Sequence, residues 1–267
     1  MAKKLSIKEF IELKNKRQTV VTTAFDEWTA KACEDAGMDM ILTWSDTFEK
    51  NQAMVEEVRK GAPNTLIGSG IPSIGAYSSE EEALRLAGEY IAMGVDIIYC
   101  SGLVPEKFAA LRRHHYPCAG HVGYLPVQDT WFGGPRAVGK KADEAIRVYE
   151  NTLALQDAGV VAVEMECVPA DIAAEISKRV DIMVISMGSG PHCDGQFLFS
   201  CDILGTHDGH YPRHCKTYAN LRETATNALT QYKDDVLDQS YPENKHNIKI
   251  KEEEYGRFMD ALEKRGH

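Results

Sequence analysis

Residues 163–169 read Val163-Glu164-Met165-Glu166-Cys167-Val168-Pro169, and they complete an apolar run that begins after Asp157-Ala158-Gly159. The run predicts a buried strand with a carboxylate at its carboxyl end, and Pro169 marks the start of a helix directly after it. Barrel enzymes carry acid–base residues at the carboxyl ends of such strands. Glu166 is therefore the first candidate for a catalytic residue.

Short apolar runs alternate with longer amphipathic segments along the chain. Eight runs are typical of strands, and the last is the weakest: Thr19–Ala24, Met38–Thr43, Thr65–Ser69, Ile97–Cys100, Pro117–His121, Val160–Glu166, Ile182–Met187 and Ile203–Gly205. Helical patterns lie between them, as in Ser79–Met93, Ala142–Ala158 and Ala170–Lys178. Apolar runs of this kind indicate strands that are covered on both faces, and therefore a parallel sheet.

Eight such units in 267 residues predict a single-domain (β/α)8 barrel. We expect an additional helix in residues 1–18 and a polar helical extension in residues 233–267, outside the barrel or at a subunit contact. A doubly wound open sheet is the alternative fold. It would need a phosphate-binding glycine turn after the first strand, where the chain instead has Phe25-Asp26-Glu27-Trp28.

The bulk composition limits the classes of function. A net charge of −10 and a pI of about 5.4 argue against nucleic acid or an anionic membrane as the main partner. No apolar run approaches the roughly 20 residues that span a bilayer, and the first residues lack the apolar core of a signal peptide, so we expect a cytoplasmic protein. The 7 cysteines include no Cys-x-x-Cys pair, which argues against a disulfide framework.

The carboxyl ends of barrel strands share one mouth, and polar residues gather at the predicted ends. These residues are Asp26, Ser45, Asp46, Ser69, Tyr99, Ser101, His121, Glu164, Glu166 and the turn Ser186–Gly190. Such a ring suits acid–base chemistry on a small polar molecule. Glu164 and Glu166 share one face of their strand because they are two residues apart. We favour Glu166 as the catalytic group, although a buried carboxylate with a purely structural role is also consistent with the pattern.

Two glycine-containing segments add candidates. His121 lies in Gly120-His121-Val122-Gly123, where glycine allows close approach of backbone or ligand, and it is either a functional or a structural histidine. The turn Ser186-Met187-Gly188-Ser189-Gly190 can present backbone N–H groups to a carboxylate or phosphate. Its two serines, Ser186 and Ser189, are therefore candidates for substrate binding.

Two later groups combine histidine with cysteine. They are His192-Cys193-Asp194 with Cys201, and His207-Asp208-Gly209-His210 with His214 and Cys215. Neither group has a recognised zinc spacing. We therefore interpret them as loop and helix-cap residues and predict no metal site.

With these residues identified, the chain resembles the ketopantoate hydroxymethyltransferase (3-methyl-2-oxobutanoate hydroxymethyltransferase) family, within the wider phosphoenolpyruvate mutase/isocitrate lyase group of barrels. The resemblance runs from about Val20 to about Leu221. It rests on dispersed motifs: Thr23-Ala24-Phe25-Asp26, Gly61-Ala62-Pro63-Asn64, Gly120-His121-Val122-Gly123, Phe132-Gly133-Gly134 with Gly139-Lys140, Glu166-Cys167-Val168-Pro169, Gly188-Ser189-Gly190 and Asp194-Gly195-Gln196.

The resemblance implies the barrel fold and a homo-oligomer, which is a decamer in that family. It implies a 2-oxo acid substrate and methylenetetrahydrofolate as the donor of a one-carbon unit. The glutamate of the Glu-Cys-Val-Pro motif falls on Glu166, which would remove a proton next to the carbonyl. The histidine of the Gly-His-x-Gly motif falls on His121.

The chain departs from the family pattern where that family binds Mg²⁺. The three carboxylates that follow the second, third and fourth strands fall on Ser45, Gly70 and Ser101, and the substrate-binding lysine falls on Tyr99. Asp46 is displaced by one residue from the first of these positions. Because Mg²⁺ needs hard oxygen ligands and typically carboxylates, we expect the family's metal site to be lost. Candidates for stabilising an enolate in its place are Tyr99, Ser45, Ser101, His121 and backbone N–H groups.

Three functions fit the sequence. The first is a 3-methyl-2-oxobutanoate hydroxymethyltransferase-like enzyme that acts on a small 2-oxo acid or a related carbonyl compound, with Glu166 as the base and His121 as a donor or orienting group. The second is a metal-independent C–C lyase, aldolase or hydrolase in the same mouth. The third is a non-catalytic relative that binds a metabolite. We favour the first.

Overall fold

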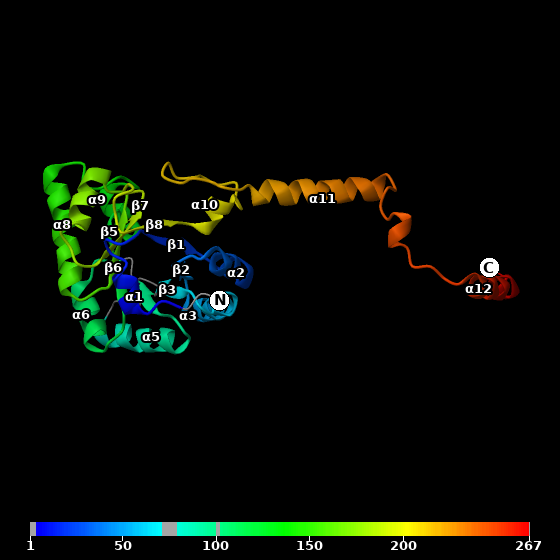
Figure 1. Cartoon of the computed structure of the whole chain (residues 1–267), viewed down its shortest axis with the longest axis horizontal. Helices are drawn as coiled ribbons and strands as arrows, with labels where there is room; N and C mark the ends of the chain where they lie inside the picture. Colours follow the sequence, from blue (N-terminus) through cyan, green and yellow to red (C-terminus); the bar gives the residue numbers. More distant parts are fainter. Residues whose placement is uncertain (1–3, 71–78, 100–101, 267) are drawn as a thin grey trace. The chain divides into compact units, whose positions relative to one another are not determined.

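The computed structural model describes residues 4–70, 79–99 and 102–266 (Figure 1). The chain divides into two compact units, of which the first runs to Tyr218 and the second from Ala219 to the C-terminus. No helix among the described residues is long and apolar enough to cross a membrane. The assignment of the whole chain to one domain stays a prediction.

The first unit is a closed barrel of eight parallel strands in chain order. The strands are β1 (Thr19–Thr23), β2 (Met40–Thr43), β3 (Leu66–Gly70), β4 (Ile97–Tyr99), β5 (Cys118–Gly123), β6 (Ala162–Glu166), β7 (Met183–Met187) and β8 (Gly195–Leu198). β8 closes the ring by pairing with both β7 and β1. The predicted (β/α)8 fold is confirmed.

Helices alternate with the strands and cover the outside of the barrel (Figure 1). They are α1 (Ile7–Ile11), α2 (Glu27–Ala36), α3 (Phe48–Gly61), α5 (Glu80–Ala92), α6 (Pro105–Arg113), α7 (Asp129–Phe132), α8 (Ala142–Asp157), α9 (Ala170–Ser177) and α10 (Ser200–Leu204). A short 3-10 turn, η1 (Pro126–Gln128), precedes α7. Glycines at 37, 94 and 159 adopt left-handed φ angles before β2, β4 and β6, because only glycine enters that region without strain.

The predicted eighth strand, Ile203–Gly205, is wrong. Those residues belong to the end of helix α10, which stops at the left-handed Gly205. The true eighth strand, Gly195–Leu198, has no continuous apolar run, since only alternate residues of it are buried. Gly195 also has to be a glycine, because a Cβ there would lie 2.1 Å from Oγ1 of Thr19 on β1.

Alternation along each strand separates the interior of the barrel from the layer beneath the helices. Ala162 packs inside the barrel with side chains from the other strands, whereas Val163 and Met165 pack outward under the helices. Because side chains alternate between the two faces, Glu164 and Glu166 share the inward face with Ala162. Phe10 of α1 joins the interior cluster from the amino end of the barrel.

The second unit is helical and consists of α11 (Leu221–Leu237), the 3-10 turn η2 (Asn244–His246) and α12 (Glu252–Arg265). Neither α11 nor α12 contains a buried residue. The extension predicted for residues 233–267 is thus helical, although its first helix begins earlier, at Leu221. At the other end of the chain, the helix expected in residues 1–18 is the short α1. It begins with a capping box formed by Ser6 and Glu9.

Candidate active site

The carboxyl ends of three neighbouring strands bring four reactive side chains together. Tyr99 ends β4, His121 lies on β5, and Glu164 and Glu166 lie on β6, where His121 is in register with Glu164. The charged groups are almost completely buried, with exposed fractions of 2% for His121, 6% for Glu164 and 8% for Glu166. The sequence had predicted Tyr99, His121 and Glu166 for this mouth, and the structure places them side by side.

Hydrogen bonds and close contacts join the four groups into one cluster. The Tyr99 hydroxyl donates to the Glu164 carboxylate through a short bond, and its oxygen also lies 3.2 Å from Nδ1 of His121. On the other side of the ring, Nε2 of His121 lies 3.1 Å from Oε2 of Glu166 and 3.9 Å from Oε1 of Glu164. Nε2 is buried, and its contacts place it beside the carboxylates of Glu164 and Glu166. A substrate atom bound next to Glu166 can therefore also reach this nitrogen.

The electrostatics of the cluster favour a charged imidazole. Burial alone lowers the pKa of His121, but the negative charges of Glu164 and then Glu166 outweigh it and hold that pKa above its ordinary value. Burial raises the pKa of Glu164, although the neighbouring His121 charge acts in the opposite direction. The ligand atoms of His121, Glu164 and Glu166 all lie within 4.8 Å of one another, so these three could also hold a cation.

The turn that carries Glu166 is built on close backbone contacts. The backbone N–H of Tyr124 donates to the Glu166 carbonyl over 2.8 Å. Gly123 makes this approach possible, because it has a φ of +89° and a Cβ there would lie 2.3 Å from the same carbonyl oxygen. Cys167 adopts a left-handed φ of +53°, which costs a non-glycine residue about 1–3 kcal/mol. Such strain beside a buried carboxylate is typical of functional sites.

The opposite side of the mouth is aromatic. Phe25, Trp44 and Phe199 follow β1, β2 and β8, and Trp44 makes edge contacts with both phenyl rings at centroid distances of 5.2 and 5.7 Å. Gly70 gives Trp44 its space, since a Cβ at Gly70 would lie 3.1 Å from that of Trp44. Phe199 was missed by the sequence analysis because the eighth strand had been placed after it.

The predicted substrate-binding residues Ser45 and Asp46 are engaged with one another and with helix α3. The Ser45 hydroxyl donates to Oδ1 of Asp46, and Nζ of Lys50 donates to Oδ2, both over 3.1 Å. The Asp46 side chain is 80% exposed. Hydrogen bonds from its own backbone, then from Lys50 and Ser45, lower the pKa of Asp46.

The positions that correspond to the family's magnesium ligands offer a poor donor set. Ser45 provides a hydroxyl, Gly70 provides no side chain, and Ser101 lies outside the described residues. Mg²⁺ is usually bound through one or more carboxylates, and neither Ser45 nor Gly70 supplies one. The residues at these two positions therefore do not fit the family's metal site.

The predicted serines of the turn after β7 help to build that turn. Oγ of Ser189 accepts from the backbone N–H of Val168 and donates to the Met165 carbonyl, over 2.9 and 2.8 Å. Oγ of Ser186 accepts from the Ser189 backbone N–H over 3.1 Å. The turn is thereby fastened to the segment that follows Glu166, and a substrate-binding role for either serine stays a prediction. Asp26 caps helix α2 by accepting from the Thr29 backbone N–H.

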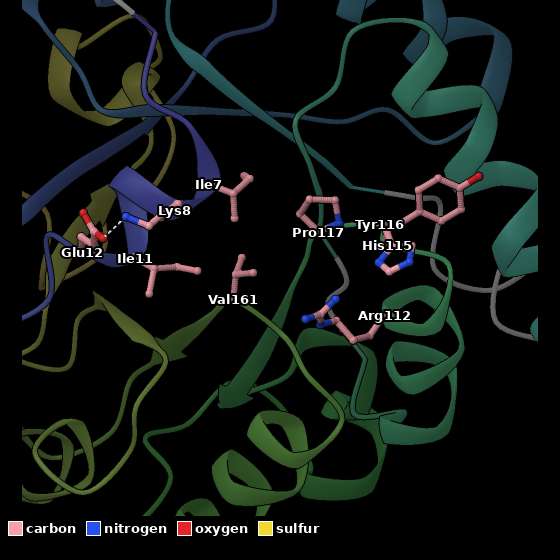
Figure 2. A pocket seen from close by; sticks show the side chains of 9 residues that line it. All are labelled: Ile7, Lys8, Ile11, Glu12, Arg112, His115, Tyr116, Pro117 and Val161. Carbon is pink, nitrogen blue, oxygen red and sulfur yellow. Dashed lines mark hydrogen bonds and ion pairs between the residues drawn. The ribbon is translucent and has the colours of Figure 1, made fainter.

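A cavity of about 490 Å³ lies at the opposite end of the barrel (Figure 2). Ile7 and Ile11 of α1 line it together with Arg112 and Val161 (Figure 2). Val161 precedes β6 whereas Glu166 ends it, and five residues of strand span roughly 16 Å. The cavity is thus remote from the acid–base cluster, and we do not assign the chemistry to it.

Comparison with known proteins agrees with the fold. The family model for ketopantoate hydroxymethyltransferase matches residues 4–244. The 3-methyl-2-oxobutanoate hydroxymethyltransferase of Thermosipho melanesiensis is 33% identical over 264 residues, which covers 92% of this chain and 99% of that protein. The protein of the same name from Acetivibrio thermocellus is 34% identical over 272 residues, covering 94% and 95% of the two chains.

These matches place the chain among the (β/α)8-barrel enzymes. Within that class, the chain belongs to the ketopantoate hydroxymethyltransferase family, as the sequence motifs had indicated. Solved structures with the same fold include a phosphonopyruvate hydrolase complex with oxalate and Mg²⁺, at a TM-score of 0.56 and 12% identity over 98% of this chain and 99% of that one. Another is 2,3-dimethylmalate lyase, a member of the PEP mutase/isocitrate lyase superfamily. It has a TM-score of 0.54 and 12% sequence identity, over 98% of this chain and 99% of that one.

Proposed function

We propose that this enzyme removes a proton from the carbon next to the carbonyl of a small 2-oxo acid, with Glu166 as the base. The observation that carries the proposal is a carboxylate at the end of β6 that is 8% exposed and lies 3.1 Å from a buried imidazole. A positioned base of this kind typically accelerates proton transfer by about 10²–10⁴-fold. The name of the relatives makes 3-methyl-2-oxobutanoate the first substrate to test.

In the proposed reaction the C–H bond breaks, its proton passes to Glu166, and its electron pair forms an enolate. The one-carbon donor that we propose is methylenetetrahydrofolate: water breaks both C–N bonds of its methylene group and releases tetrahydrofolate and formaldehyde. The enolate carbon then forms a C–C bond to formaldehyde as the C=O π bond opens, and the new hydroxyl oxygen takes the proton back from Glu166. The N–H at Nε2 of His121 donates to the substrate oxygen, where the negative charge develops. The burial of Nε2 and its position 3.1 Å from the carboxylate of the proposed base support this role.

Tyr99 and Glu164 are positioning residues in this proposal. The oxygen of Tyr99 accepts from the Nδ1–H of His121, and its hydroxyl donates to Glu164. This chain of bonds fixes the ring orientation and keeps a negative charge near the imidazole. His121 thereby stays protonated and can stabilise an enolate.

We further propose that the reaction does not use Mg²⁺ at the family's position, because Ser45 and Gly70 offer no carboxylate there. We also propose a homo-oligomer, which the family resemblance implies, and a cytoplasmic location, which the sequence patterns suggest.

A metal-independent C–C lyase, aldolase or hydrolase is the second candidate. The specific observation in its favour is Trp44, which lies against Gly70 and makes the β2–β3 side of the mouth aromatic. The same Glu166–His121 pair would serve such an enzyme in the cleavage direction, by stabilising the enolate that leaves. The two candidates share the base and differ in the second substrate.

Exchange of the C3 hydrogen of 3-methyl-2-oxobutanoate in D₂O, followed by proton NMR with and without methylenetetrahydrofolate, tests the proposal. We expect exchange without the folate and a hydroxymethylated product with it, both persisting after EDTA treatment. Exchange without any product would favour the second candidate. Absence of exchange would remove the assignment of this substrate, and exchange that needs added Mg²⁺ would contradict the metal-independent step.

A further inference from the structure

A second group of potential ligands lies outside the mouth cluster, where α10 meets the loop that follows it. Cys201 and Asp202 belong to α10, and His207 follows soon after Gly205 ends that helix. One ligand atom from each of these three side chains lies within 4.8 Å of the other two. Their spacing in the sequence matches no zinc motif, so only the fold reveals the group.

The atoms of this group face one another. Nε2 of His207 lies 2.8 Å from Oδ1 of Asp202, whose exposed fraction is only 5%. Tyr211 stacks on the imidazole at a centroid distance of 4.3 Å and an interplanar angle of 18°. The hydroxyl of Tyr211 also donates to the His207 carbonyl over 2.8 Å. Both ligands are therefore held in place before any cation arrives.

The loop that carries His207 returns to α10, because the Tyr218 backbone N–H donates to the Ile203 carbonyl over 2.8 Å. Residues 206–218 are therefore held to α10 at both ends, by this bond and by the contact between His207 and Asp202.

We propose that Cys201, Asp202 and His207 form a zinc site that fastens residues 206–218 to α10, with a water molecule as the fourth ligand. A thiolate, an imidazole and a carboxylate are a donor set that suits Zn²⁺ better than Mg²⁺ or Ca²⁺. In the structure, Nδ1 of His207 accepts from the Gly209 backbone N–H over 3.1 Å. Zinc binding through Nε2 would move the ring proton to Nδ1, and this bond would then be lost. That contact lies in an exposed turn, where water can replace it.

The fastened loop extends to the mouth of the barrel. A Cβ at Gly188, directly after β7, would lie 2.8 Å from Nδ1 of His214, so His214 rests against the end of that strand. Zinc would thus hold His214 at the mouth although none of its ligands belongs to the acid–base cluster. The proposal goes beyond the proposed reaction and is tested without measuring activity.

The test is zinc content by mass spectrometry after the full chain has been loaded with Zn²⁺ and desalted, with Cys201→Ser and His207→Ala alongside. We expect one zinc per wild-type chain and at least a tenfold loss of affinity in each variant. Cys33→Ser, at a buried cysteine outside the group, and His210→Ala, at an exposed histidine of the same loop, are matched controls that should keep the metal.

Wild-type protein without zinc, or full zinc in Cys201→Ser and His207→Ala, would overturn the site. Circular dichroism reports whether each variant is folded. Cobalt substitution of the wild-type chain needs no variant: a thiolate-to-cobalt charge-transfer band is expected, and its absence would contradict thiolate ligation.

Discussion

The two sides of the barrel mouth differ in their chemistry. On the side of β4–β6, Tyr99, His121 and Glu166 are joined with Glu164 in a buried, charged cluster. Across the mouth, Trp44 and its two phenylalanine neighbours form an aromatic surface. The proposed base Glu166 and His121 lie on the first side, while Ser45 and Gly70 on the second side carry no carboxylate. Charged side chains on only one side of the mouth would therefore stabilise the charge that develops during a reaction.

The largest effect is expected for Glu166→Gln, which removes the base and keeps its shape. Turnover should fall by about 10²–10⁴-fold with little change in KM, because the lost interaction belongs to the transition state. Steady-state kinetics on purified protein measure it. Glu175→Gln, at an exposed glutamate that pairs with Lys178 on the outside of the barrel, is the matched control. Equal turnover in wild type and Glu166→Gln would remove Glu166 from the mechanism.

Tyr99→Phe should have the next largest effect, because it removes the hydroxyl between His121 and Glu164. We expect turnover to fall roughly tenfold, as for other groups that orient a catalytic side chain. The bond from Tyr99 lowers the pKa of Glu164 against the effect of burial, so its loss raises that pKa further. The pH profile of kcat/KM should then shift to higher pH. A fall in turnover with an unchanged profile would indicate a merely structural tyrosine.

The charged side should also make stability depend on pH. The pKa values of His121 and Glu164 are both raised, so the folded state holds these protons more tightly than the unfolded state does. This stabilisation is complete below the ordinary values of 4.5 for Glu164 and 6.5 for His121, and it is lost as pH rises through the folded values. Urea unfolding should thus show wild-type stability decreasing above these values.

The double variant His121→Asn/Glu164→Gln removes both groups, and its stability should change less over the same pH range. Both groups have to be replaced, because the His121 charge itself lowers the pKa of Glu164. His210→Asn, at an exposed histidine, serves as the control. If the free energy of unfolding changed equally with pH in wild type and the double variant, the raised pKa values of His121 and Glu164 would be contradicted.

The charged side could be predicted from the sequence because its information is local. The apolar runs predicted for β5 and β6 end at His121 and Glu166, the residues that enter the mouth. Glu164 was correctly placed on the face of Glu166, but its contact with Tyr99 depends on two strands that are distant in the sequence. Its part in the cluster was therefore visible only in the folded barrel.

The aromatic side could not be predicted in the same way. Phe199 follows a strand, Gly195–Leu198, that forms because its backbone pairs with β1 and β7 and not because it is apolar. The directions in which the side chains of Ser45 and Asp46 point depend on where β2 ends, and that strand ends at Thr43. Beyond that residue strand alternation no longer applies, and the pair instead joins Lys50 at the start of α3.

Asp46→Asn tests this second side and should have the smallest effect. Asp46 is the carboxylate nearest in sequence to a lost metal ligand, yet it is exposed and paired with Lys50. Exposed ion pairs of this kind contribute little, so turnover and its response to added Mg²⁺ should change by less than about twofold. Asp35→Asn is the matched control, since Asp35 is exposed and pairs with Lys31 across the same spacing. A tenfold loss that Mg²⁺ modulates, seen only in Asp46→Asn, would mean that a metal is bound there and that both sides of the mouth take part in the reaction.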